Sequence, residues 1–218
     1  MLKQWDKIWL NVLYLVGLVL LMIMVLAGQS WSLRFKLVWL VAIILPVHAC
    51  EEWQIPGGFH YQYNLSFGSA LPNKYPMSRL TDMLTVCIAE VVYIICAVFY
   101  QYHWVVMALC GFCLLEVFMH TFFGITMYKR FKNKGKKTIY NPGLASAYLG
   151  FGTTAAAMIL NLSKYAAITG KDWGLTILLL LLMALFEIFL PERIFRNKQT
   201  KYGFDSPMYF TKFLDQKN

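Results

Sequence analysis

Charged side chains are scarce in this sequence: they make up 14% of its 218 residues, whereas 59% of the residues are hydrophobic. A soluble domain is typically about 25% charged and about 45–50% apolar, so the composition excludes an ordinary soluble domain. Basic residues outnumber acidic ones by twenty to eleven, but they lie between apolar runs rather than on one folded face. They therefore indicate membrane topology, and nucleic acid is not expected as a partner.

A disulfide framework is also lacking. The chain has five cysteines, an odd number, and each lies inside an apolar run, which favours reduced side chains. Cys110 and Cys113 form a C-x-x-C pair, but no second pair matches it, so the signal for a zinc or redox site is weak. Cys113 stays a minor candidate because it shares a helix face with Glu116 and His120.

Long apolar runs are abundant, by contrast. A bilayer core about 30 Å thick is crossed by roughly 20 helical residues. Windows of this size fall at about 9–27, 36–55, 80–101, 103–128, 142–166 and 173–194. The sequence therefore predicts an all-α, polytopic membrane protein: a bundle of about six transmembrane helices in one domain, residues 1–218.

The basic residues are unevenly divided between the two sides of this predicted bundle. Sixteen lie in the N-terminus, two loops and the C-terminal tail, on one side, and four lie in the opposite loops. The positive-inside rule then places both termini in the cytoplasm. The expected location is the cell (inner) membrane, crossed several times.

The predicted spans nevertheless contain ionisable residues. A charged group at the centre of a bilayer costs about 2.5–3.5 kcal/mol on insertion scales, so such groups need partners and commonly mark function. They occur in four of the spans: His48, Glu51, Glu52, Asp82, Glu90, Glu116, His120 and Glu187.

Helical spacing groups these residues into two chelating faces. His48 with Glu51 and Glu52 forms an i, i+3, i+4 set, and Glu116 with His120 forms an i, i+4 pair. Imidazoles combined with carboxylates suit zinc, iron or manganese. These five residues are therefore the predicted ligands of one or two divalent transition-metal ions, and no organic cofactor is expected. Additional candidates are Glu90, Glu187 and Asn141.

Two turns flank the predicted site. Pro56, Gly57 and Gly58 end the second span and let the chain reverse. Asn141 is a candidate helix cap before Pro142 at the start of the fifth span. His60 and His103 are expected to be solvated or interfacial.

These motifs carry a family resemblance. The segments His48-Ala-Cys-Glu51-Glu52, Pro56-Gly57-Gly58-Phe59, Glu116-x-x-x-His120 and Asn141-Pro142-Gly143 resemble the HXXEE-domain family of small bacterial membrane proteins. The resemblance covers roughly residues 37–190. It implies an integral membrane protein built around these His and Glu residues, and it implies no particular activity.

The function expected from the residues is that of an intramembrane metal-dependent enzyme, a hydrolase first and a di-metal oxidoreductase second. Glu51 or Glu52 is the expected catalytic base, and a membrane lipid or lipophilic small molecule is the expected partner. The pair Glu51-Glu52 also resembles the paired glutamates of CAAX-processing proteases. However, Pro56 stands where that family has an arginine, which argues against a protease.

Other interpretations stay open at this point. The same residues could form a metal-free buried network, or act as an acid–base pair in an isomerase. They could also form a proton or cation relay in a transporter, or belong to a membrane binding or immunity protein.

Overall fold

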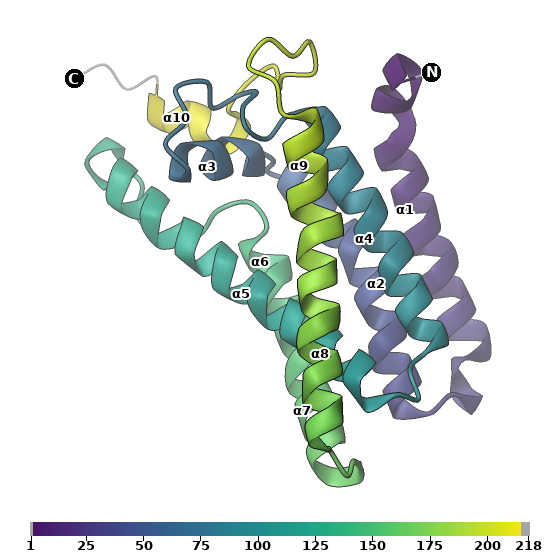
Figure 1. The fold of residues 1–218 in the computed structure, drawn as a ribbon. Helices are drawn as coiled ribbons and strands as arrows, with labels where there is room; N and C mark the ends of the chain where they lie inside the picture. The colour runs from purple at the N-terminus through teal and green to yellow at the C-terminus, as the bar shows by residue number, and fades with distance from the viewer. Residues whose placement is uncertain (1, 215–218) are drawn as a thin grey trace.

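The computed structural model describes residues 2–214 as a bundle of helices (Figure 1). Within this range, six helical segments are long and apolar enough to cross a membrane: Gln4–Ser30, Leu33–Trp53, Arg79–Val98, His103–Lys134, Leu144–Tyr165 and Gly170–Phe195. The all-α fold with six spans is thus confirmed, and the chain is a multi-pass membrane protein. The start of the first helix and the last described helix lie at the same end of the bundle (Figure 1).

The spans contain the following elements in chain order. They are α1 (Leu2–Ala27), α2 (Leu33–Trp53), α4 (Arg79–Val98), α5 (His103–Phe131), α6 (Leu144–Ser146) continuing into α7 (Thr153–Tyr165), and α8 (Gly170–Met183) continuing into α9 (Leu190–Phe195). Two short helices, α3 (Phe59–Ser66) and α10 (Thr211–Leu214), lie outside the spans, across the end of the bundle that carries the termini (Figure 1).

Side-chain caps fix where several spans begin. The Ser32 hydroxyl accepts a hydrogen bond from Phe35 N at the start of α2, and capping boxes at Ser78 and Thr169 begin α4 and α8. The expected cap at Asn141 was wrong. The residue that caps α6 is Gly143, two positions later. Its φ of 89° lies in the left-handed region, which neither Asn141 nor Pro142 adopts.

Helix α2 lies at the centre of the packing, with α1, α4 and α7 against it, while α5 packs against α7 and α8. Small residues permit the closest approaches, as the composition of the fifth span indicates. A Cβ atom at Gly150 would lie 2.7 Å from Ile44 Cγ2, so glycine is needed there for contact with α2. Packing of this kind associates helices in lipid, where the hydrophobic effect does not.

Two spans change their winding at mid-length. Residues Ala147–Gly152 of the fifth span and Ala184–Phe189 of the sixth form π-helical segments between two α-helical parts. Each π turn acts as one extra residue in an α-helix, and such insertions are frequent at functional sites. Hydrophobic periodicity gave no sign of either segment.

The chain end folds back over α3 and buries His60. This side chain is 2% exposed and stacks on Phe204, with ring centroids 3.6 Å apart. The expectation that His60 is solvated was therefore wrong, because the expectation ignored the returning segment. Burial lowers the pKa of His60 to about 3.

Acid should loosen this packing. The pKa of His60 in the folded protein lies below its ordinary value, so its protonation opposes folding as pH falls from about 6.5 towards 3. At pH 5 the loss should be about 2 kcal/mol. Hydrogen exchange of residues 204–214 should accelerate between pH 7.5 and 5, after correction for intrinsic rates. The same acceleration in a His60→Phe variant, which keeps the stacking and does not titrate, would contradict this assignment.

Candidate metal centre

Two helices bring four donor atoms together near the end of the bundle that carries the termini. His48 and Glu52 come from α2, and Glu116 and His120 come from α5. His48 Nε2 lies 3.4 Å from Glu52 Oε1 and 3.5 Å from Glu116 Oε2. His120 Nε2 lies 3.4 Å from each of the same two oxygens. The structure thus brings the two predicted chelating faces together.

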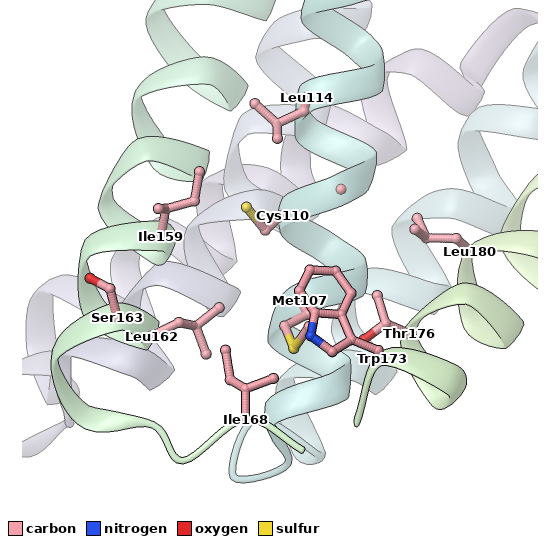
Figure 2. Close-up of a pocket in the computed structure, with 11 residues that line it drawn as sticks. Met107, Cys110, Leu114, Ile159, Leu162, Ser163, Ile168, Trp173, Thr176 and Leu180 are labelled. Carbon is pink, nitrogen blue, oxygen red and sulfur yellow. The ribbon is translucent and has the colours of Figure 1, made fainter. Parts of the chain in front are cut away.

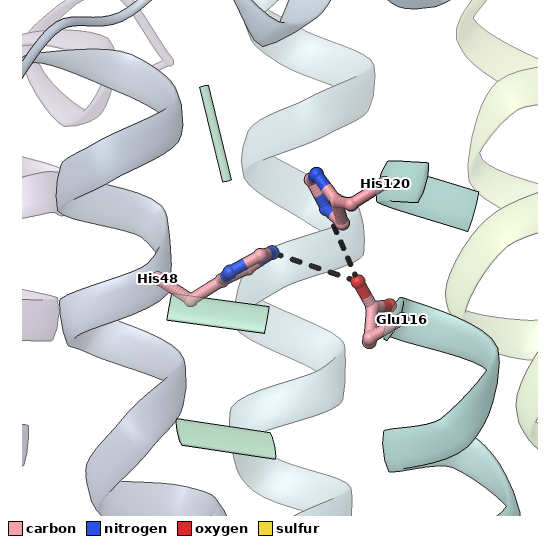
Figure 3. Close-up of side chains that lie close together, drawn as sticks. All are labelled: His48, Glu116 and His120. Carbon is pink, nitrogen blue, oxygen red and sulfur yellow. Dashed lines mark ion pairs between the residues drawn. The ribbon is translucent and has the colours of Figure 1, made fainter. Parts of the chain in front are cut away.

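The spacing of these donors is that of ligands around one small cation. Two donors about 2.0–2.1 Å from a metal ion, at a tetrahedral angle, are separated by about 3.4 Å. The most compact group is His48, Glu116 and His120, whose donor atoms all lie within 4.8 Å of one another. In Figure 3 both imidazoles point towards the Glu116 carboxylate, His48 from one side and His120 from above.

Glu51 does not face this group directly. Its Oε2 accepts hydrogen bonds from Ser146 N (2.7 Å) and from the Ser146 hydroxyl (2.5 Å), and its Oε1 accepts from Ala145 N (3.2 Å) and the Tyr140 hydroxyl (3.1 Å). The carboxylate therefore binds free backbone amides at the start of the fifth span. These hydrogen bonds join α2 to the start of the fifth span and to Tyr140 in the loop before it.

Ser146 passes the influence of Glu51 on to His48. The Ser146 hydroxyl has one proton, which it donates to Glu51, and its oxygen lies 2.8 Å from His48 Nδ1. His48 Nδ1 must then be the donor in that contact, since an ionised carboxylate can only accept. In a neutral imidazole this arrangement leaves the lone pair on Nε2, the atom that faces Glu52 and Glu116.

His120 is positioned mainly by close packing. A Cβ atom at Gly143 would lie 2.0 Å from His120 Cε1, and the Phe59 ring lies 5.2 Å from the imidazole. His120 Nδ1 has no hydrogen-bond partner among the described residues.

Asn141 is fully buried next to His120 and holds the loop before the fifth span against α5. In the amide orientation that its neighbours favour, its oxygen accepts from Gly124 N at 3.0 Å and its nitrogen donates to Ile139 O at 3.1 Å. Its role in the structure is therefore to anchor the loop that carries Gly143.

A cavity of about 110 Å³ adjoins three of the four donor residues. His48, Glu52 and Glu116 line it together with Asp82, Glu187 and Tyr93. Within residues 2–214, no hydrogen-bond partner is found for either Glu187 carboxylate oxygen, for Asp82 Oδ2 or for the Tyr93 hydroxyl. The cavity thus presents unpaired polar atoms beside the candidate ligands.

The remaining predicted candidates lie elsewhere. Glu90 is buried without a partner in the described part of the chain and does not line this cavity, and Cys113 is buried in the apolar core. Sequence reasoning did not select Asp82, although it noted the residue within a span. It missed Ser146 and Tyr140 altogether, because ordinary polar residues carry no signal before the fold is known.

A larger hollow of about 390 Å³ lies between α5, α7 and α8 (Figure 2). Apolar side chains dominate it, among them Met107, Leu114, Ile159 and Trp173, and Figure 2 shows them lining the gap between the helices. It contains no ionisable side chain other than the thiol of Cys110. Its chemistry suits an acyl chain and provides no reaction centre.

Comparison with known protein families identifies the motif. A family model described as "Protein of unknown function with HXXEE motif" matches residues 39–158, more than half of the chain. The chain belongs to the HXXEE family. The match includes His48, Glu51, Glu52, Glu116 and His120, and it ends before the sixth span. Comparisons with curated proteins and with solved structures give no match.

The contact between Gly143 and His120 gives a direct test of the site geometry. A Gly143→Ala variant should displace the imidazole and strain a backbone with positive φ, with an expected loss of about 1–3 kcal/mol. Thermal unfolding in detergent should show a lower midpoint. Gly174→Ala is the matched control, because a Cβ atom at Gly174 meets nothing within 4 Å. Equal midpoints for the two variants would contradict the packing described.

Proposed function

We propose that this HXXEE protein is an intramembrane metal-dependent hydrolase that acts on a lipid-like substrate. His48, His120, Glu52 and Glu116 hold one divalent transition-metal ion. The observation that carries the proposal is the set of four N–O separations of 3.4–3.5 Å among these side chains. Two of the separations lie within a helix and two join α2 to α5. Zinc is the first choice for two imidazoles and two carboxylates, with iron or manganese next.

Proton accounting favours a metal over a metal-free network. The hydrogen bonds of Ser146 place the lone pair of a neutral His48 at Nε2, where it faces two carboxylate oxygens. Such a contact is repulsive unless a cation lies between the donors or the imidazole takes up a second proton. A metal ion removes this repulsion at His48. The metal-free acid–base enzyme needs the second proton instead.

The catalytic base should be a carboxylate that has no other partner. Glu52 and Glu116 are committed to the histidines, and Glu51 accepts four hydrogen bonds, two of them from Ser146. Glu187 is 0% exposed, has two unpaired oxygens within the described structure and lines the cavity beside the ligands. We therefore assign the base role to Glu187 in place of Glu51, with Asp82 on the same cavity as the second candidate.

The chemistry then divides between metal and protein. The metal, when bound, would polarise a substrate carbonyl or phosphoryl oxygen and lower the pKa of water. Glu187 accepts the proton from the attacking water, and Glu51 acts through Ser146 to hold His48 in the orientation required. The aromatic rings of Phe59 and Phe123 near His120 restrict access of bulk water.

With both termini in the cytoplasm, as we propose, this centre lies in the inner half of the membrane. Of the nineteen basic residues that the structure describes, fifteen lie at the end where the first helix begins (Figure 1), which supports a cytoplasmic location for both termini. His48 and Glu52 lie in the last third of α2, His120 lies in the half of α5 nearest that end, and Glu116 lies at the middle of α5. A substrate would therefore come from the cytoplasmic leaflet of the cell membrane.

Metal analysis tests the proposal most directly. Purified protein should contain about one equivalent of zinc, iron or manganese per chain, and His48→Ala or His120→Ala should lose most of it. His103→Ala is the control, since His103 begins α5 far from the donors. Wild-type protein that retains activity after strong chelation and binds well below one equivalent would reject the metal and leave the acid–base enzyme.

Glu187→Gln separates the base from the ligands. The variant should keep its metal, because Glu187 is not a ligand, and should lose at least about 100-fold in hydrolysis, the usual effect of removing a base. Turnover of acyl-ester and phosphodiester lipid analogues in detergent gives the measurement. Glu90→Gln, another buried unpaired glutamate in the described chain, is the control. Equal activity of the two variants would remove Glu187 from the mechanism.

A further inference from the structure

A second hollow opens beside the candidate metal centre, at the end of the bundle that carries the termini. It measures about 550 Å³ and lies between α3, the loop that follows it and the last turns of the sixth span. Its walls include Tyr63, Phe67, Phe189, Glu192, Arg196 and Lys198. None of these residues belongs to the proposed ligand set.

The polar wall of this hollow is predominantly cationic. Arg196 and Lys198 are exposed, and within residues 2–214 neither forms an ion pair with an acidic side chain. The only carboxylate on the wall is Glu192, whose Oε2 accepts a hydrogen bond from the Tyr63 hydroxyl at 2.6 Å. Two unpaired cations just beyond the end of a membrane-spanning helix suit a phosphate group.

The other wall is apolar and exposed. Phe67 is 58% exposed and Phe189 is 65% exposed, and Phe189 belongs to the membrane-spanning segment Gly170–Phe195. Aromatic rings at the end of a span lie at the boundary between lipid chains and headgroups. Phe189 therefore borders lipid chains, whereas Phe67 follows α3 outside the spans. The hollow thus joins a site for an anionic headgroup to a surface for its acyl chains.

Tyr63 connects this hollow to the metal centre. Its side chain lines both the 550 Å³ hollow and the 110 Å³ cavity that contains His48, Glu52 and Glu116. The hydrogen bond from Tyr63 to Glu192 fixes the ring between the two spaces. A lipid seated in the hollow would therefore have its glycerol region next to the proposed reaction centre.

We propose that the hollow between α3 and α9 is the headgroup site for an anionic phospholipid, with Arg196 and Lys198 binding its phosphate. The binding of this lipid stands on charge and shape alone. Its identity as the substrate rests on the proposed function, because it requires the metal centre beyond Tyr63.

Lipid binding by the full chain tests this site. Delipidated protein in neutral detergent is titrated with phosphatidylglycerol and with phosphatidylcholine, and binding is followed by native mass spectrometry. The wild type should prefer phosphatidylglycerol by about tenfold or more, and an Arg196→Gln/Lys198→Gln double variant should lose that preference. Lys164→Gln/Lys171→Gln, which removes two exposed lysines at the opposite end, is the matched control and should keep it.

Two other outcomes reject the site. Equal losses in the two double variants would mean a general surface-charge effect. Inorganic phosphate that competes as well as phosphatidylglycerol would mean a free-anion site without a role for lipid. The titration is repeated with His48→Ala, which lacks a proposed ligand. A preference that persists there while wild-type protein binds no metal would leave the headgroup site standing and reject only the hydrolase.

Discussion

Two imidazole nitrogens and two carboxylate oxygens meet at 3.4–3.5 Å inside a bundle that is otherwise built from apolar side chains. A buried polar group without a partner carries a desolvation cost, so these four groups stay paired only while α2 and α5 keep one rotation and one depth relative to each other. A shift of either helix by a single residue would turn its donors about 100° away. The cluster therefore fixes how α2 and α5 pack together, and the other helices pack around this pair.

Residues 136–140 and the segment around Tyr209, which lie over the end of the bundle, support the same geometry. The Lys136 ammonium donates to the Tyr140 carbonyl oxygen and lies 4.9 Å from the centroid of the Tyr209 ring, and the Tyr140 hydroxyl in turn donates to Glu51. Burial and the charge of Lys212 lower the pKa of Lys136 to about 8. A continuous set of contacts thus runs from the chain end through Glu51 and Ser146 to His48.

A feature of the site could be predicted from the sequence when the residues that form it lie close together in the chain. His48, Glu52, Glu116 and His120 were found because i, i+4 spacing is a local property of one helix. Glu51, at i+3 from His48, shares the same helix face, but its partners Ala145 and Ser146 lie more than ninety residues away in the chain. The burial of His60 likewise depends on a distant segment. Local periodicity could indicate which side chains share a face, but it could not indicate what that face meets.

The π-helical segment of the sixth span gives that helix two different neighbours. Before Ala184–Phe189 the span packs on α5 as α8, and within and after the segment it packs on α4, the latter part being α9. One continuous helix therefore joins the two walls of the bundle, and Glu187 lies at the crossover. Any change in the angle between α4 and α5 must be absorbed at this winding defect. Glu187, which faces the cavity, thus lies where movement of α4 relative to α5 would rotate its side chain.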